Sequence, residues 1–146
     1  MTPTARAVAA SAAADMALAV LQASRSGRAD AEQFGGGFYT AAKRLIAHDC
    51  TDPDLTPERV AMGIGLSRAS LYRIFAKHDE SVAAVIWSSR IERSWRMLTT
   101  SEGVGMLVSD IAFHCGFREL PTFTRMFRRR YGMAPRDARE QGALNS

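Results

Sequence analysis

Hydrophobic positions recur at helical spacings in almost every segment of the chain. From Ser81 to Leu98 the apolar residues keep a rhythm of three to four positions without glycine or proline, which predicts one long helix. The same rhythm predicts a short helix beginning at Pro57 and others at about residues 5–24, 38–48, 68–77, 108–114 and 120–131. No segment alternates as a strand would. The pattern therefore predicts an all-α fold.

Capping and turn residues indicate where these helices begin and end. Thr56 offers a capping hydroxyl directly before a proline at the first helical position, and Ser67 offers one to the next helix. Residues 35–37 are three glycines, and we expect them to break the chain before the helix at 38–48. Leu107 has no capping oxygen, so the helix near residue 108 is expected to begin at Ser109 instead.

Length and composition narrow the class of protein. A chain of 146 residues, 47% hydrophobic and 23% charged, is long enough for one globular domain or two very small ones. No apolar run approaches the 18 or more residues of a membrane span, so we expect a cytoplasmic protein with no membrane partner. Two cysteines without a CxxC pair, and histidines that do not cluster, lead us to expect no metal and no cofactor. No arrangement typical of a catalytic site emerges either, so we do not expect an enzyme.

Positive charge is concentrated near the C-terminus. The net charge is +4, and 17 of the 19 basic residues are arginines, whose planar donors suit phosphates and guanine edges. Six arginines and a single acid fall between residues 118 and 136, whereas residues 1–50 carry five basic and four acidic side chains. This local excess fits either a polyanion site or a solvated helix face.

Two stretches of the chain match each other. At an offset of 51, Val60, Ala61, Ile64, Gly65 and Leu66 correspond to Ile111, Ala112, Cys115, Gly116 and Phe117. At an offset of 52, Leu71, Ile74 and Phe75 correspond to Phe123, Met126 and Phe127. The alanine lets two helices cross closely, and the glycine suits a turn with positive φ. Each copy therefore predicts a helix-turn-helix motif, with Gly65 and Gly116 as the turn glycines.

The residues of the second copy carry a specific resemblance. Asp110-Ile-Ala-Phe-His-Cys-Gly-Phe117, followed by Phe123-Thr-Arg-Met-Phe-Arg-Arg-Arg-Tyr-Gly-Met-Ala-Pro135, resembles the signature of AraC/XylS-family transcription regulators. The resemblance covers about residues 55–137 and implies two helix-turn-helix subdomains joined by a long helix. It implies a DNA-binding domain at 51–140 that follows an N-terminal helical segment of unclear role at 1–50. Within that domain it implies a first motif at 56–78, a connecting helix at 81–98 and a second motif at 107–132.

The expected DNA contacts lie on the outward faces of the two recognition helices, the second helix of each motif. The resemblance implies that both helices enter successive major-groove segments of double-stranded DNA. Helical spacing and the resemblance together give the expected base contacts as Arg68, Ala69, Tyr72, Arg73, Arg118, Pro121, Thr122 and Arg125. The expected phosphate contacts are Ser70, Thr124, Arg128 and Arg129, with the helix N-termini at Pro57 and Ser109 as further anchors. Glu119 is expected to pair with Arg118.

Other interpretations stay open at this point. The first copy alone resembles the tetracycline-repressor type, but that family has one such motif followed by a long ligand domain. A helical interaction module that modulates another regulator, without binding DNA itself, is the alternative function. RNA polymerase is a further candidate partner, as is a second copy of the chain joined through the N-terminal helices. The 50 leading residues are too few for a typical effector domain, so the chain is expected to be a short regulator or a fragment of a longer one.

Overall fold

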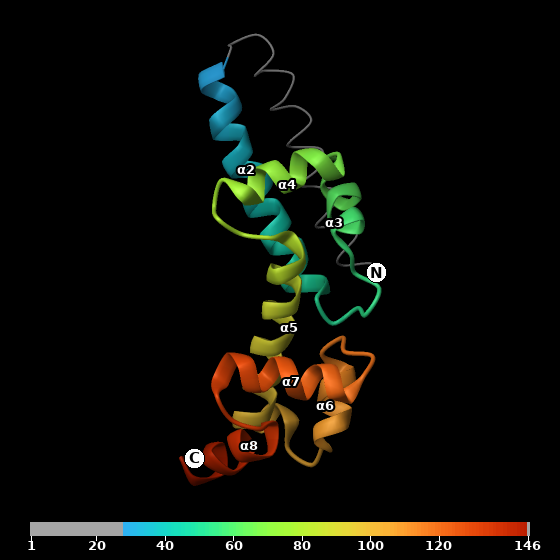
Figure 1. Ribbon diagram of the computed structural model, residues 1–146, viewed down its shortest axis with the longest axis vertical. Coiled ribbons are helices and arrows are strands. Elements are labelled where there is room, and N and C mark those ends of the chain that lie inside the picture. The colour runs from blue at the N-terminus through green and yellow to red at the C-terminus, as the bar shows by residue number, and fades with distance from the viewer. Residues whose placement is uncertain (1–27, 146) are drawn as a thin grey trace. The chain divides into compact units, whose positions relative to one another are not determined.

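The computed structural model describes residues 28–145, and side chains from Gly36 onward (Figure 1). Every regular element in this range is helical and none is a strand, which confirms the all-α prediction. The helix predicted at residues 5–24 lies outside the described residues. The elements are α2 (Arg28–Asp49), α3 (Pro57–Ile64), α4 (Arg68–Ala76), α5 (Val82–Thr99), the 3-10 helix η1 (Ser101–Gly103), α6 (Val108–His114), α7 (Leu120–Tyr131) and α8 (Pro135–Leu144).

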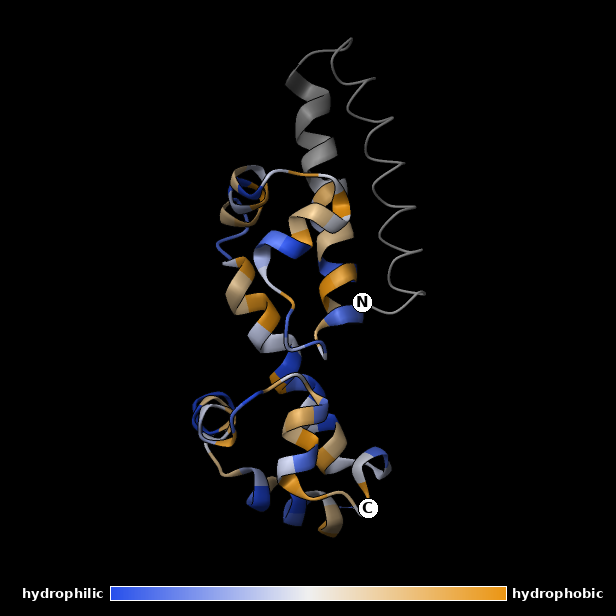
Figure 2. Ribbon diagram, turned by 90° about the vertical axis from the view of Figure 1, so that its right-hand side faces the viewer, coloured by the Kyte–Doolittle hydropathy of each residue, from blue (hydrophilic) through white to orange (hydrophobic). Residues whose placement is uncertain are grey.

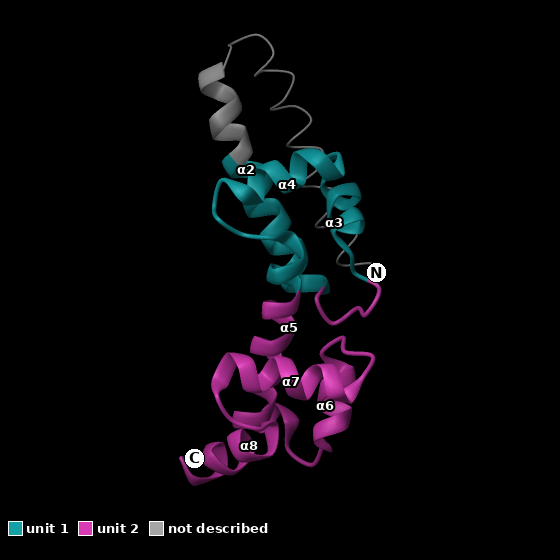
Figure 3. Ribbon diagram, in the orientation of Figure 1, with its two compact units in different colours: residues 1–49, 55–86 teal, residues 50–54, 87–146 magenta. Residues whose placement is uncertain are grey.

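The chain forms two compact units (Figure 3). Unit 1 contains α2, α3, α4 and the first residues of α5, up to Ile86. Unit 2 contains residues 50–54, the rest of α5 from Trp87, and then η1, α6, α7 and α8. Within each unit the helices carry both hydrophobic and hydrophilic faces (Figure 2). Each unit thus holds one pair of the helices that the repeat predicts.

The core of unit 1 is formed where α2 packs against α3 and α4. Ala42 and Ile46 of α2 are fully buried, and each buried aliphatic or aromatic side chain of ordinary size contributes about 1.5–3 kcal/mol. The helix starts follow the sequence prediction, because Thr56 Oγ1 accepts from the Arg59 amide at 3.3 Å and Ser67 Oγ accepts from the Ser70 amide at 3.1 Å. The apolar partners from α3, α4 and α5 are Val60, Ala61, Ile64, Leu71, Phe75, Val82 and Ile86.

The three glycines at residues 35–37 do not break the chain, so that prediction is wrong. Helix α2 runs through them from Arg28 to Asp49. A glycine inside a helix costs about 1 kcal/mol relative to alanine, which disfavours the helix without forbidding it. The following turns are held by burial of Phe38 and Ala42, and Thr40 Oγ1 donates to the Gly36 carbonyl at 3.0 Å. A helix nucleated in the buried half can extend through the glycines, because extension is easier than nucleation.

Aromatic side chains dominate the core of unit 2. Phe117, Phe123 and Phe127 form a series with ring-centre distances of 5.1 and 5.6 Å. Trp87 packs on Phe117 at 5.5 Å, and the Trp95 ring lies 6.0 Å from that of Phe127. Both tryptophans pack against the core of unit 2. They share one face of α5, and unit 1 contains only the turn of that helix before Trp87.

Two helices of unit 2 differ from the sequence prediction, α6 in its first residue and α8 in having been missed. Helix α6 begins at Val108 rather than Ser109, and Leu107 is its N-cap without a side-chain hydrogen bond. The Leu107 backbone is extended, and its carbonyl accepts from the Ile111 amide at 3.0 Å. Burial of Ile111 and Ala112 therefore sets the start of α6 in place of a capping oxygen. Helix α8 was not predicted, because it has little apolar rhythm beyond the buried Ala138.

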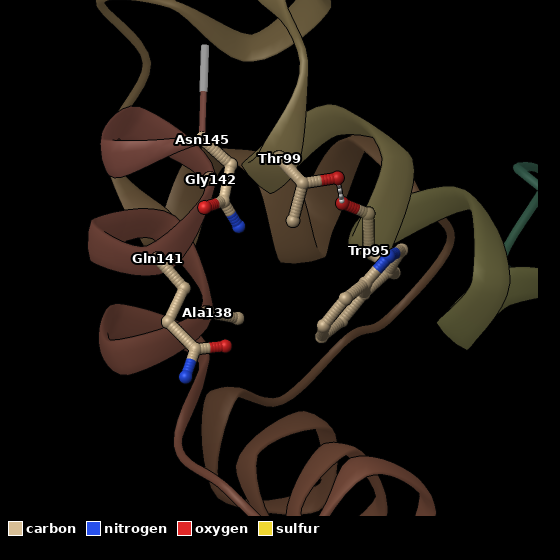
Figure 4. A pocket seen from close by; sticks show the side chains of 6 residues that line it. All are labelled: Trp95, Thr99, Ala138, Gln141, Gly142 and Asn145. Carbon is tan, nitrogen blue, oxygen red and sulfur yellow. Dashed lines mark hydrogen bonds between the residues drawn. The ribbon is translucent and has the colours of Figure 1, made fainter.

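Helix α8 packs closely against the end of α5 (Figure 4). A Cβ atom at Gly142 would lie 2.8 Å from the Thr99 Cα atom, so the close approach requires glycine. A pocket of about 190 Å³ remains there, lined by Trp95, Thr99, Ala138, Gln141, Gly142 and Asn145. The Thr99 hydroxyl donates its hydrogen to the Trp95 carbonyl at 2.8 Å, so this hydrogen is not available to a molecule in the pocket.

Candidate nucleic-acid interface

The first helix-turn-helix motif consists of α3, a tight turn and α4. Gly65 has φ of 77°, in the left-handed region that favours glycine. The turn is closed by the Leu66 amide, which donates to the Ala61 carbonyl at 2.9 Å. Ala61 is 2% exposed where the two helices meet, and Leu71 and Phe75 of α4 are completely buried. Because this side of α4 is buried, the opposite side faces solvent.

The outward face of α4 carries the base contacts predicted from its sequence. Arg68, Ala69, Tyr72 and Arg73 are exposed, and Ser70 is half-buried. The two arginines have different partners. Arg68 donates to the Tyr72 hydroxyl and pairs with Glu58 of α3, at 3.1 and 2.9 Å. Arg73 donates to Ser70 Oγ at 3.2 Å, and Ser70 in turn contacts the capping hydroxyl of Ser67.

The second motif repeats this geometry in α6, its turn and α7. Gly116 has φ of 97°, and a Cβ atom there would lie 2.6 Å from the Cys50 carbonyl oxygen. The Phe117 amide donates to the Ala112 carbonyl at 3.1 Å, as its counterpart Leu66 does in unit 1. Phe123 and Phe127 are completely buried. The other side of α7 is therefore the one available to a partner.

The outward side of α7 is strongly basic. Pro121, Arg125, Arg128 and Arg129 are exposed, and Thr122 and Thr124 are half-buried. Within the described residues, no carboxylate lies within 4 Å of the guanidinium groups of Arg125, Arg128 or Arg129, so these charges are available to phosphates. A shallow depression on this helix is lined by Leu120, Pro121, Thr124, Arg125 and Arg128.

Arg118 does not pair with Glu119 as the sequence led us to expect. It pairs with Asp54 of the loop between α2 and α3, and both side chains are more than half exposed. Glu119 is the N-cap position of α7, and its carboxylate accepts from Thr122 Oγ1 at 3.5 Å. Neighbours in sequence point apart at a helix start, which leaves Arg118 free to reach the loop. The pair with Asp54 engages one nitrogen of the Arg118 guanidinium.

Residues 50–54 are held to unit 2 by Arg90, whose role the sequence analysis missed. Arg90 is 3% exposed, and its guanidinium donates to the carbonyls of Cys50 and Asp52 at 2.7 and 2.8 Å. It also lies 4.7 Å from the Trp87 ring centre. Burial lowers the pKa of the Arg90 guanidinium, and the two carbonyls and the ring offset that penalty. A signal was present, because Arg90 follows Val82 and Ile86 at intervals of four on the buried stripe of α5.

The described residues offer no metal site. Among residues 28–145, no group of three histidine, cysteine or carboxylate side chains could hold an ion. None of the helices in that range combines the length and apolar character needed to cross a membrane.

Comparison with known proteins agrees with this geometry. Residues 60–141, more than half of the chain, match a family described as a helix-turn-helix domain, and this domain is the AraC-type one. The chain belongs to the AraC/XylS family. Members of the AraC/XylS family are DNA-binding transcription regulators and not enzymes.

Relatives of known name lie in the same family. The chain is 28% identical over 96 residues to the transcriptional activator NphR of a Rhodococcus species, covering 66% of this chain and 28% of that protein. It is 31% identical over 104 residues to the HTH-type transcriptional regulator ArgR of Pseudomonas aeruginosa, covering 70% of this chain and 30% of that protein. The chain thus spans less than a third of the length of the AraC/XylS relatives it matches.

Solved structures share the fold. A DNA-binding transcriptional dual regulator from Escherichia coli K-12 aligns with a TM-score of 0.65 at 21% identity, over 70% of this chain and 89% of that chain. An AraC-type regulator from Chromobacterium violaceum aligns with a TM-score of 0.63 at 23% identity, over 72% of this chain and 91% of that chain. The two-motif fold of the AraC/XylS DNA-binding domain is therefore present here.

Proposed function

We propose that this protein is a sequence-specific DNA-binding transcription regulator whose DNA-binding domain spans residues 51–140. Family membership supports the class, and the outward faces of α4 and α7 support the binding mode. The observation that carries the proposal is the repeated geometry. In each motif a buried alanine and a glycine with positive φ present one helix with its polar face outward.

The proposed mechanism is bipartite binding by one chain. Helices α4 and α7 would enter successive major-groove segments, with their centres about 34 Å apart, one turn of the duplex. A major groove admits an α-helix, and arginine can read guanine through two parallel donors. Arg73 and Arg125 are the proposed central base readers. Arg68, Ala69, Tyr72, Arg118, Pro121 and Thr122 complete the proposed base-contacting set.

Phosphate contacts would supply most of the affinity. Arg128 and Arg129 lie toward the C-terminal end of α7, where the absence of a carboxylate partner among the described residues leaves them free to bind phosphates. Ser70 and Thr124 are the proposed neutral phosphate donors. The amides at the start of α3, after Pro57, are a further proposed anchor, because they are oriented toward an anion. Such contacts position the protein without reading sequence.

We also propose a cellular location and two further partners for a protein with this function. Because a bacterial regulator acts on the chromosome, we propose that the protein works in the cytoplasm. RNA polymerase is a proposed second partner, and a second copy of the chain, joined through residues 1–50, is a proposed third. Co-precipitation with purified polymerase and light scattering of the free protein test these two partners separately.

Salt dependence of DNA binding tests the proposal. If six to ten phosphates are contacted, affinity for a duplex falls by about 10³ to 10⁵ between 50 and 200 mM salt. Fluorescence anisotropy with a labelled 40-base-pair duplex measures this slope, and nuclease footprinting measures the span. A footprint covering two adjacent turns agrees with bipartite binding. A flat salt response would instead favour a protein partner, and a footprint of one turn would contradict the use of both helices.

A further inference from the structure

Arg68, the first residue of α4, is anchored on two sides although 59% of its side chain is exposed. Its Nε donates to the Tyr72 hydroxyl at 3.1 Å, and its Nη1 lies 2.9 Å from Glu58 Oε1. The guanidinium carbon is also 5.2 Å from the Tyr72 ring centre, close enough for a cation–π contact. An exposed arginine samples many rotamers, so three contacts at once restrict its orientation.

These contacts leave several N–H donors of the Arg68 guanidinium available for a base. A guanidinium has five N–H donors in a fixed plane, and the contacts with Tyr72 and Glu58 engage one on Nε and one on Nη1. The second Nη1 hydrogen and both hydrogens of Nη2 remain. A free hydrogen on each of Nη1 and Nη2 is what a guanidinium needs to bind guanine O6 and N7 through two donors.

We propose that Glu58 and Tyr72 are positioning residues that hold Arg68 oriented for a guanine, so that this base is read with little loss of side-chain entropy on binding. This inference rests on the proposed function. In this role the Tyr72 hydroxyl acts through Arg68, whereas the Tyr72 ring stays a proposed base contact that Tyr72→Phe retains. Glu58 connects the first helix of the motif to base recognition. A side chain that is already oriented loses less entropy on binding, so more of its contact energy contributes to discrimination between bases.

The same arrangement recurs at Arg73. Ser70 Oγ accepts from Arg73 Nη2 at 3.2 Å and is itself 2.9 Å from Ser67 Oγ, the hydroxyl that caps α4. Arg125, Arg128 and Arg129 of α7 have no such side-chain contact among the described residues. Both arginines of α4 thus have side-chain partners, whereas on α7 only Arg130 has one among the described residues, in Glu92.

A carboxylate beside an arginine could have the opposite effect and hold it away from DNA. The two roles predict different changes in DNA binding when Glu58 is removed. If Glu58 competes with DNA, its removal tightens binding to every sequence alike. If Glu58 positions Arg68, its removal weakens discrimination at one base pair. The neutral Tyr72 hydroxyl favours positioning, because it holds Arg68 without competing for its charge as an anion would.

The experiment compares base preference in matched variants. A duplex selected by the wild-type protein from a random pool is remade with every single-base change, and each is measured by competition. Arg68→Ala defines the base pair that Arg68 reads. Glu58→Gln and Tyr72→Phe are each expected to lose about three- to ten-fold of discrimination at that same pair and nowhere else. Either change combined with Arg68→Ala should add no further loss, since both act through Arg68.

Glu140→Gln is the matched control, because it removes the same charge from α8 and frees Arg136 from an exposed pair. It should leave every base preference unchanged, and thermal unfolding should show all variants folded. Equal tightening on all sequences by Glu58→Gln would overturn the inference. Losses at base pairs that Arg68→Ala leaves unaffected would also overturn it, as would an Arg68→Ala variant with unchanged preferences. A wild-type protein without any sequence preference would overturn the proposed function, and this inference with it.

Discussion

Arg90 shows how a single polar residue can organise its surroundings. Its buried guanidinium ties α5 to two carbonyls of residues 50–54, and its Nε would lie 2.9 Å from a Cβ atom at Gly116. The position of Arg90 therefore leaves no room for a side chain at Gly116. A buried charge is tolerated only where hydrogen bonds replace water, and the Cys50 and Asp52 carbonyls do so here.

Replacing Arg90 should destabilise the protein strongly. Arg90→Met removes one donor from the buried Cys50 carbonyl and one from the partly buried Asp52 carbonyl, so we expect the free energy of unfolding to fall by about 2–4 kcal/mol. Arg96→Met, on the same helix, removes an exposed arginine that lies 3.7 Å from Glu102 and should cost less than about 1 kcal/mol. Urea denaturation followed by circular dichroism measures both. Equal losses in the two variants would contradict the anchoring role of Arg90.

Cys115 should be inert in the folded protein. Burial raises the pKa of its thiol to about 12, and its sulfur contacts Met97 Sδ at 3.7 Å. The unfolded chain has a thiol pKa of about 8.5, so stability from the protonated thiol is present below that pH and is lost as pH rises toward 12. Iodoacetamide at pH 8 should therefore leave Cys115 unmodified until urea unfolds the chain. Ser101→Cys, at an exposed position, is the reactive control. Rapid native labelling of Cys115 would show that it is not buried.

At the scale of elements, the sequence predicted helices wherever apolar rhythm and caps agree. Helix α7 runs from Leu120 to Tyr131 as predicted, because Phe123 and Phe127 fix its buried side. The predicted chain break at the glycines 35–37 was wrong, because burial of neighbouring residues outweighs the low helix propensity of glycine. Helix α8 was missed because one buried alanine is too weak a signal in a polar segment.

The turn between α6 and α7 should tolerate no side chain at Gly116. Gly116→Ala combines a φ of 97° with a Cβ atom 2.6 Å from the Cys50 carbonyl oxygen. Gly132→Ala has a similar φ of 72° but meets nothing within 4 Å, so it should cost only the backbone strain of about 1–2 kcal/mol. We expect Gly116→Ala to lower the melting temperature clearly more. Similar losses would mean that backbone conformation alone requires glycine there.

The outward faces of the recognition helices could be predicted, but the partners of their arginines could not. Spacing on α4 separates buried Leu71 and Phe75 from exposed Arg73, and the structure has the same division. The Glu58–Arg68 and Asp54–Arg118 pairs join residues separated in sequence by a turn or by much of the chain. Such pairs depend on tertiary packing, which helical periodicity does not contain.

Across the whole molecule, the arginines proposed to contact DNA should fall into two groups, those that bind phosphates and those that read bases. Arg129→Ala should weaken binding to all DNA sequences alike and reduce the salt slope by about one, because it removes a proposed phosphate contact. Arg73→Ala and Arg125→Ala should each relax preference at one base pair, at about 1–3 kcal/mol of discrimination. Competition between selected and scrambled duplexes measures the difference. Equal losses on every sequence for all three variants would refute the assignment of base readers.

We propose that one chain reads DNA with two unlike helices, and selection of bound duplexes from a random pool by the purified protein tests this binding mode. Binding by both helices should give a consensus of two different sequence blocks whose centres are about one duplex turn, 10 base pairs, apart. A consensus with a single block, or no enrichment at all, would contradict it.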